Sequence, residues 1–197
     1  MSGSCMDASQ APAPTLPDAE PERRIAAMVA NHHGQVWRSL RRLGVSECDA
    51  DDASQQVFMV AHRRLADIAP ESEQSFLLQT ALRVAAQFRR SRRRRREDDD
   101  KDLPVLADTA ASPEELADRR RARAMLDRAL EAMPMDLRKV FVLFDLEELT
   151  TAEVASVLHV PKGTVASRLR RAREVFRETV ARMSTPRSPR YGAGGKP

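Results

Sequence analysis

The first half of the chain contains three runs of apolar residues at helical spacing. Over residues 23–43 they recur every three or four positions, which places them on one face of a helix that Gly44 then ends. Ser46 and the acidic residues after it suit the start of a second helix, which is predicted to continue to about Ile68. A third helix is predicted over residues 72–96. Its buried stripe consists of Phe76, Leu77, Thr80, Ala81, Val84, Ala85 and Phe88.

A second group of helices begins near residue 112. Ser112 is followed by a proline and two glutamates, a sequence typical of a helix N-terminus, and the apolar stripe behind them continues to Met133. A densely apolar helix is predicted over residues 136–146. Aromatic residues make up only 4% of the chain, and few windows alternate apolar and polar residues with the period of a strand. We therefore predict an all-α fold.

Loss of the apolar pattern divides the chain into five parts. Residues 1–22 and 184–197 are rich in small residues and proline and are expected to be disordered tails. Between them we predict two small helical domains, at residues 23–96 and 113–183. Residues 97–112 are acidic and contain a proline, so they are predicted to form a flexible linker.

The charges are segregated along the chain, although the net charge is only +4. Basic residues gather at 89–96 and again at 162–177, whereas acidic residues gather at 7–22 and 97–118. Separate positive patches favour a polyanionic partner, of which nucleic acid is the commonest and an anionic membrane the second.

The sequence shows no motif for catalysis, for cofactor binding or for metal binding. Cys5 and Cys48 match neither a disulfide framework nor a zinc site, the four histidines are scattered, and there is no glycine-rich phosphate loop. We therefore expect no catalytic site, no cofactor and no bound metal. No signal peptide begins the chain and no apolar run approaches the roughly 20 residues of a membrane span, so we expect a cytoplasmic protein without membrane insertion.

The C-terminal part of the chain predicts a helix-turn-helix. Thr150 and Glu153 have the spacing of a capping box, His159 lies in a tight turn that favours positive φ, and Pro161 opens the last helix. One face of this helix is apolar and consists of Val165, Leu169, Ala172 and Phe176. Basic residues lie opposite, so the helix can pack by one face and enter the major groove of DNA with the other. An ordinary amphipathic hairpin with a solvated basic face is the alternative.

These residues resemble a known family. Residues 133–173, MPMDLRKVFVLFDLEELTTAEVASVLHVPKGTVASRLRRAR, are similar to region 4 of bacterial RNA polymerase sigma factors of the extracytoplasmic-function group. The resemblance implies that the helix-turn-helix reads the −35 promoter element and that this domain binds the polymerase β flap. Glu148 stands where the group usually has glycine. The implied DNA-reading residues are Lys162, Thr164, Ala166, Ser167, Arg168, Arg170, Arg171 and Arg173.

The first domain resembles region 2 of the same group, less closely. Residues 49–65, DADDASQQVFMVAHRRL, are similar to the helix that docks on the β′ coiled coil. The implied polymerase contacts are Asp49, Asp52, Gln55, Gln56 and Met59. The helix over residues 72–96 corresponds to the one that melts the −10 element. Its implied DNA contacts are Arg83, Gln87, Arg89, Arg90, Arg92 and Arg93.

Two features of this domain depart from the family. Arg83 and Gln87 stand where Asn and Asp are common, so the family's −10 preference is not carried over. Apolar residues are also consecutive at 57–61 and encircle their helix. We hypothesise that Val57 and Val60 enlarge a binding face for β′ or an anti-sigma protein; the alternative is that they fill the intramolecular core.

The arginine block at residues 89–96 has a physical explanation within this resemblance. Cations suit the C-terminal end of a helix, and beside melted DNA they would neutralise phosphates. A solvated arginine stretch or a eukaryotic localisation signal are the alternatives.

We predict an alternative sigma factor, which is not an enzyme. The partners that the resemblance implies are core RNA polymerase, promoter DNA and an anti-sigma factor. A free-standing helix-turn-helix regulator that does not bind polymerase is the rival interpretation, but it would have a ligand or phosphoacceptor domain upstream. An RNA-binding protein would need exposed aromatic residues for base stacking.

Overall fold

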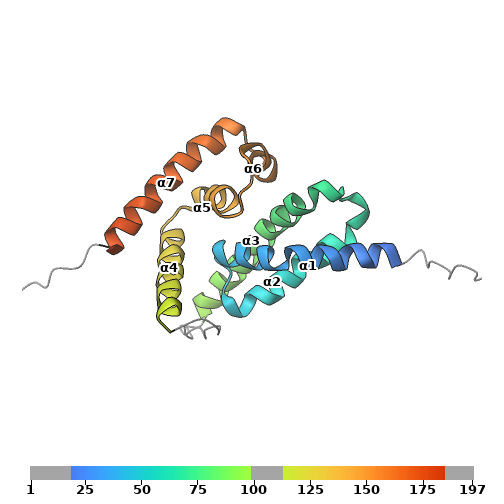
Figure 1. Ribbon diagram of the computed structural model, residues 1–197, viewed down its shortest axis with the longest axis horizontal. Coiled ribbons are helices and arrows are strands. Elements are labelled where there is room, and N and C mark those ends of the chain that lie inside the picture. Colours follow the sequence, from blue (N-terminus) through green and yellow to red (C-terminus); the bar gives the residue numbers. More distant parts are fainter. Residues whose placement is uncertain (1–18, 99–112, 185–197) are drawn as a thin grey trace, which may run out of the picture.

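The computed structural model describes residues 19–98 and 113–184, and every regular element within these ranges is a helix (Figure 1). The all-α prediction is confirmed. Ser112 and most residues of the expected tails and linker lie outside the described residues. Residues 19–22, which were expected in the N-terminal tail, are instead the first turn of the first helix.

The first domain is a bundle of three helices, in which α2 packs against both α1 and α3 (Figure 1). These helices are α1 (Ala19–Arg42), α2 (Glu47–Arg63) and α3 (Glu73–Asp98). α2 ends at Arg63 rather than at the predicted Ile68, because two short 3-10 turns follow it. They reverse the chain into α3, which continues unbroken into the arginine block as expected.

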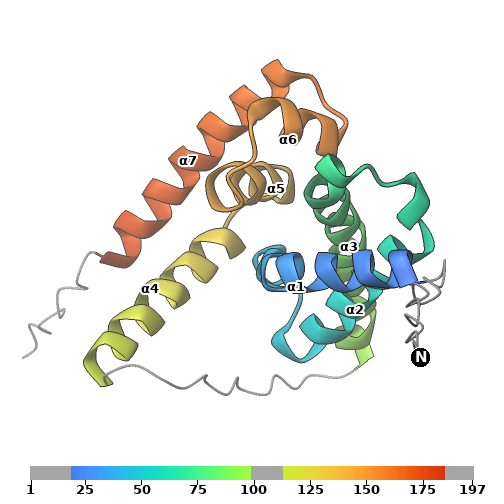
Figure 2. The same cartoon turned by 45° about the vertical axis from the view of Figure 1, so that its right-hand side comes forward.

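The second domain contains five helical elements. They are α4 (Pro113–Glu131), α5 (Met135–Phe141), a π-helical turn η3 (Val142–Leu146), α6 (Thr151–Leu158) and α7 (Lys162–Ser184). Figure 2 shows α4 and α7 on either side of α5. The helix predicted over residues 136–146 is therefore α-helical only to Phe141. Its last turn widens into π geometry, which is frequently found at functional sites.

The two domains pack against each other. Leu40 of α1 and Leu43, which directly follows this helix, belong to the same buried core as Val140 and Leu143 of the second domain. α6 also lies against α3 (Figure 2). The sequence pattern predicted two modules on a tether and gave no sign of this contact.

The consecutive apolar residues of α2 are divided by the fold. Val57 is 0% exposed and Phe58 is also buried in the core, whereas Val60 is only half-buried. The hypothesis that Val57 enlarges an external binding face is therefore wrong, because its side chain fills the space between the helices. The exposed apolar residue of this run is Met59, at 45%.

Candidate DNA and polymerase interfaces

The helix-turn-helix starts from the predicted capping box. The Glu153 backbone N–H donates to the Thr150 hydroxyl at 3.3 Å. In return the Glu153 carboxylate accepts from the Thr150 backbone N–H at 2.8 Å and from its hydroxyl at 2.7 Å. These hydrogen bonds stabilise the charged carboxylate and lower the pKa of Glu153. The box satisfies amides that the first turn of α6 leaves unpaired, so it fixes where the helix begins.

The turn between α6 and α7 depends on one left-handed residue. His159 has φ of 54° and caps the C-terminus of α6, as the sequence predicted for this position. The Val160 backbone N–H returns to the Ala155 carbonyl at 3.1 Å, which closes the turn. This reversal sets the angle at which α7 leaves α6.

One face of α7 is fixed to the rest of its domain. Val165, Leu169 and Ala172 are buried, which confirms the apolar face predicted from their spacing. Farther along α7, the rings of Phe176 and Phe141 stack with centroids 4.9 Å apart. Because this face is packed, the opposite face of α7 must point away from the domain.

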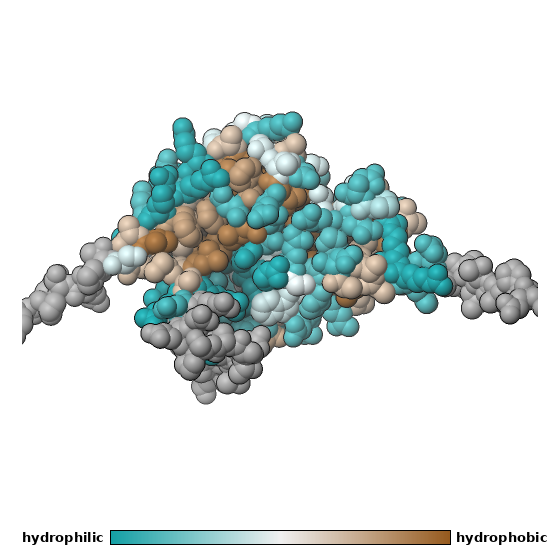
Figure 3. Space-filling model, viewed as in Figure 1, coloured by the Kyte–Doolittle hydropathy of each residue, from teal (hydrophilic) through white to brown (hydrophobic). Residues whose placement is uncertain are grey.

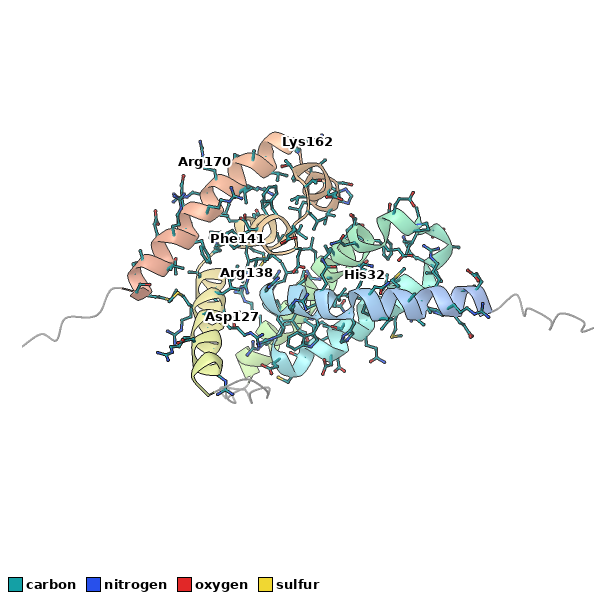
Figure 4. The ribbon with its side chains drawn as sticks, viewed as in Figure 1. His32, Asp127, Arg138, Phe141, Lys162 and Arg170 are labelled. Carbon is teal, nitrogen blue, oxygen red and sulfur yellow. The ribbon has the colours of Figure 1, made fainter. Side chains whose placement is uncertain are left out.

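The outward face of α7 carries half of the predicted DNA-reading residues. Lys162, Ala166, Ser167 and Arg170 are exposed. Figure 4 shows Lys162 at the start of α7 and Arg170 projecting away from the domain. Thr164 is half-buried, and its carbonyl accepts a hydrogen bond from the Ser167 hydroxyl at 3.0 Å.

Three other predicted arginines of α7 are paired within the domain. Arg173 donates two hydrogen bonds to the Asp145 carboxylate, at 2.6 and 3.1 Å, which raise its pKa. Its guanidinium also lies 5.4 Å from the ring centroid of Phe144. Arg171 is exposed and pairs with a glutamate one turn later at 2.9 Å, and Arg168 lies 3.8 Å from an aspartate of α5. The Asp145 carboxylate therefore competes with DNA for the Arg173 guanidinium.

The predicted DNA contacts of α3 are also divided between two faces. Arg83, Gln87 and Arg90 are exposed and spaced four and three residues apart, so they share one face of the helix. Arg93 is exposed as well, and the half-buried Arg92 lines a pocket of about 220 Å³ between α2 and α3. Arg89 is turned toward the second domain and does not share the exposed face.

Both domains match known protein families. Residues 28–95 match Sigma-70 region 2, and residues 123–175 match Sigma-70, region 4. The chain is 31% identical over 167 residues to the RNA polymerase sigma-H factor of Pseudomonas aeruginosa, a match that covers 79% of this chain and 85% of that protein. The chain belongs to the extracytoplasmic-function sigma factors. Members of this group direct transcription initiation with RNA polymerase and are not enzymes.

Further relatives agree with this assignment. This chain is also 30% identical over 160 residues to the ECF RNA polymerase sigma factor SigE of Mycolicibacterium smegmatis. That match covers 80% of this chain, which spans 62% of the length of SigE. Among the described residues, no helix is both long and apolar enough to cross a membrane.

Two solved structures share the fold. CnrH, in complex with the cytosolic domain of CnrY, is 24% identical with a TM-score of 0.63, and the match covers 84% of this chain and 93% of that one. The sigma factor RpoE of Bartonella quintana, in complex with the anti-sigma factor NepR, is 19% identical with a TM-score of 0.64. That match covers 81% of this chain and 98% of RpoE.

The predicted polymerase-binding residues of this sigma factor line the outer side of α2. Asp52, Gln55, Gln56 and Met59 are exposed, and the half-buried Asp49 accepts a hydrogen bond from the Ser46 hydroxyl. Beside them an open groove of about 430 Å³ follows the line where α1 packs on α2. It is lined by Val29, His33, Asp51, Gln55, Phe58, Met59, His62 and Arg63.

Sequence reasoning missed several residues of this groove. Val29 and His33 come from α1, so only the packing of α1 on α2 brings them beside Met59. Asp51 could have been suspected from its place in an acidic run, and its carboxylate is held by the Trp37 indole N–H at 2.9 Å. A groove shared by two helices has no signal in the spacing of either one.

Proposed function

We propose that this sigma factor binds core RNA polymerase through α2 and selects promoters with α3 and α7. The observation that carries the proposal is the exposed α2 surface with its apolar groove, on a chain that also presents a DNA-reading helix. A free-standing regulator would need the DNA-reading helix but not the α2 surface.

The chemistry of the α2 surface suits a helical protein partner. Met59 supplies an exposed apolar contact beside the buried ring of Phe58, while Asp52, Gln55 and Gln56 form a polar rim. An apolar centre with a polar rim is typical of protein interfaces, and Met adapts well to a partner's shape. In the proposed complex this surface meets the β′ coiled coil.

A second apolar surface belongs to the region 4 domain. Half-buried side chains on α4, α5 and α7 include Leu126, Leu137 and Val175. Figure 3 shows apolar residues over this domain, bordered by hydrophilic ones along α7. We assign this surface to the β flap of the polymerase.

The two DNA-facing helices act on separate promoter elements in this proposal. Lys162, Ser167 and Arg170 of α7 contact the −35 element, where arginine and lysine can reach guanine edges. Arg83 and Arg90 of α3 lie beside the −10 element and neutralise phosphates. Each phosphate contact adds about −0.9 to the slope of log affinity against log salt.

An anti-sigma protein is the proposed regulator. The solved structures of CnrH and of RpoE each contain a second protein, CnrY or the anti-sigma factor NepR. By analogy, we propose that this sigma factor is held by a similar partner, and that it acts in the cytoplasm with the polymerase.

Transcription reconstituted from purified core polymerase and this chain tests the proposal. The full chain should direct initiation from specific promoters, and Met59→Glu should abolish core binding because it places a charge at the centre of the interface. Ala27→Glu is the matched control, since Ala27 is exposed on α1 outside the groove. Specific duplex binding without any polymerase-dependent initiation would instead establish the free-standing regulator.

A further inference from the structure

The C-terminal end of α1 is held by arginines from both domains. The Leu43 carbonyl accepts a hydrogen bond from Arg89 of α3 at 2.8 Å, and the Arg42 carbonyl accepts one from Arg138 of α5. Figure 4 shows Arg138 between the second domain and the end of α1. The last carbonyls of a helix lack intrahelical partners and carry partial negative charge, so guanidinium groups stabilise them. Burial lowers the pKa of both Arg89 and Arg138.

A buried carboxylate from the second domain completes this interface. The Glu147 side chain is 3% exposed and accepts hydrogen bonds from the Ser39 hydroxyl at 2.6 Å and from Arg42 at 2.9 Å. Ser39 and Arg42 both belong to α1, in the other domain. A buried carboxylate without a partner is strongly unfavourable, so Glu147 selects this docking geometry over others.

The backbone around Glu147 is unusual as well. The π-helical turn η3 directly precedes it, and Glu148 follows with φ of 58° in the left-handed region. Such backbone costs free energy and persists where the surrounding contacts require it. Here the two features together aim the Glu147 carboxylate at α1.

A third contact joins α3 to the turn between α6 and α7. The Gln79 side-chain nitrogen of α3 lies 2.8 Å from Nε2 of His159, in the turn that opens α7. Promoter elements at −10 and −35 are separated by more than two turns of duplex, on the order of 80 Å at roughly 34–36 Å per turn. While α3 is held against α6 and the turn before α7, the two DNA-reading helices lie too close together to reach both elements at once.

We propose that Glu147 and Arg42 form a latch that holds the sigma factor closed until it engages polymerase and promoter DNA. Opening frees Arg89 from its contact with the Met135 sulfur of α5, so that it can join the exposed arginines of α3 on the DNA backbone. The functional consequence rests on the proposed function above. The closed state itself is a property of the free chain.

The latch is tested without polymerase or DNA, by energy transfer between dyes on the two domains. Cysteines replace the exposed Ala27 of α1 and Ala124 of α4 in the full chain, with Cys5 and Cys48 changed to serine. Glu147→Gln should raise the ratio of open to closed molecules by at least about tenfold, the effect of losing a charge-assisted hydrogen bond. Glu148→Gln is the matched control, because it removes the same charge from an exposed neighbour.

Two further measurements separate a latch from simple damage to the fold. Arg42→Glu should open the chain while helical circular dichroism is retained, and the charge-swapped pair Arg42→Glu with Glu147→Arg should restore part of the closed population. Unchanged energy transfer in both single variants would overturn the latch, as would a dimeric mass showing that the contact joins two copies. If wild-type chain failed to support transcription but these shifts occurred, the proposed function would fall and the latch would stand.

Discussion

Arg170 and Arg173 lie three residues apart on α7 and look equivalent in the sequence, but the structure gives them different roles. Arg170 is exposed on the outward face, whereas Arg173 pairs with Asp145 and lies over the Phe144 ring. We predict that Arg170→Ala weakens promoter binding and leaves the stability of the fold unchanged. The main effect of Arg173→Ala should instead be a loss of stability.

The magnitude for Arg173 follows from its surroundings. The side chain is 47% exposed, so solvent screening limits the two-pronged pair with Asp145 to about 1 kcal/mol. The aromatic contact adds about 0.5 kcal/mol at such an exposed site. A total of about 1.5 kcal/mol corresponds to a fall in Tm of roughly 3–6 °C for a chain of this size. Arg170→Ala should stay within about 0.5 kcal/mol of wild type, as surface substitutions do.

The assay combines thermal unfolding with promoter binding by the reconstituted holoenzyme at several salt concentrations. Arg170→Ala should reduce the salt slope by about one if it contacts phosphate, or relax sequence preference at one position if it reads a base. Asp145→Ala should reproduce the loss of stability seen with Arg173→Ala, and the double variant should be little worse than either. The reasoning would be refuted if Arg173→Ala kept the wild-type Tm and lost one unit of salt slope.

Three further predictions concern the stability of the region 4 domain. Thr150→Ala removes the cap of α6 and should cost about 1 kcal/mol of unfolding free energy, measured by chemical denaturation. The pKa of Glu153 is lowered in the folded state, so its contribution is present above about pH 4.3, the usual pKa of Glu, and is lost as pH falls through the lower folded value. Glu153→Gln should therefore flatten the acid end of the profile of Tm against pH. Phe141→Ala removes a buried ring stacked on Phe176 and should cost about 3–5 kcal/mol, measured by calorimetry. If its cost were below 1 kcal/mol, the stacking of α7 on α5 would be unimportant.

Local spacing explains why much of the helix-turn-helix could be predicted. The capping box needs only Thr150 and Glu153 three residues apart, and the apolar face of α7 needs only the helical period. The left-handed conformation of His159 follows from its position at the C-terminal end of α6, where the chain turns toward α7. Each of these features depends on residues within a few positions of one another.

The assignment of individual arginines required the tertiary structure. Arg89 contacts residues 46 positions away, and Arg173 contacts one 28 positions away. Both lie in runs of similar residues, so helical spacing alone could not distinguish the arginines with partners in the fold from those on the outward faces. Val57 shows the same limit, since an apolar side chain suits a core and a docking face equally well.

The sequence by itself determined most of the helices, the capping box of α6 and the two families of domain, because these depend on local pattern and on motifs contained within each segment. Only the tertiary structure decided that the domains close on each other through Glu147, Arg42 and Arg138. That contact joins residues about a hundred positions apart, and no periodicity along the chain connects them.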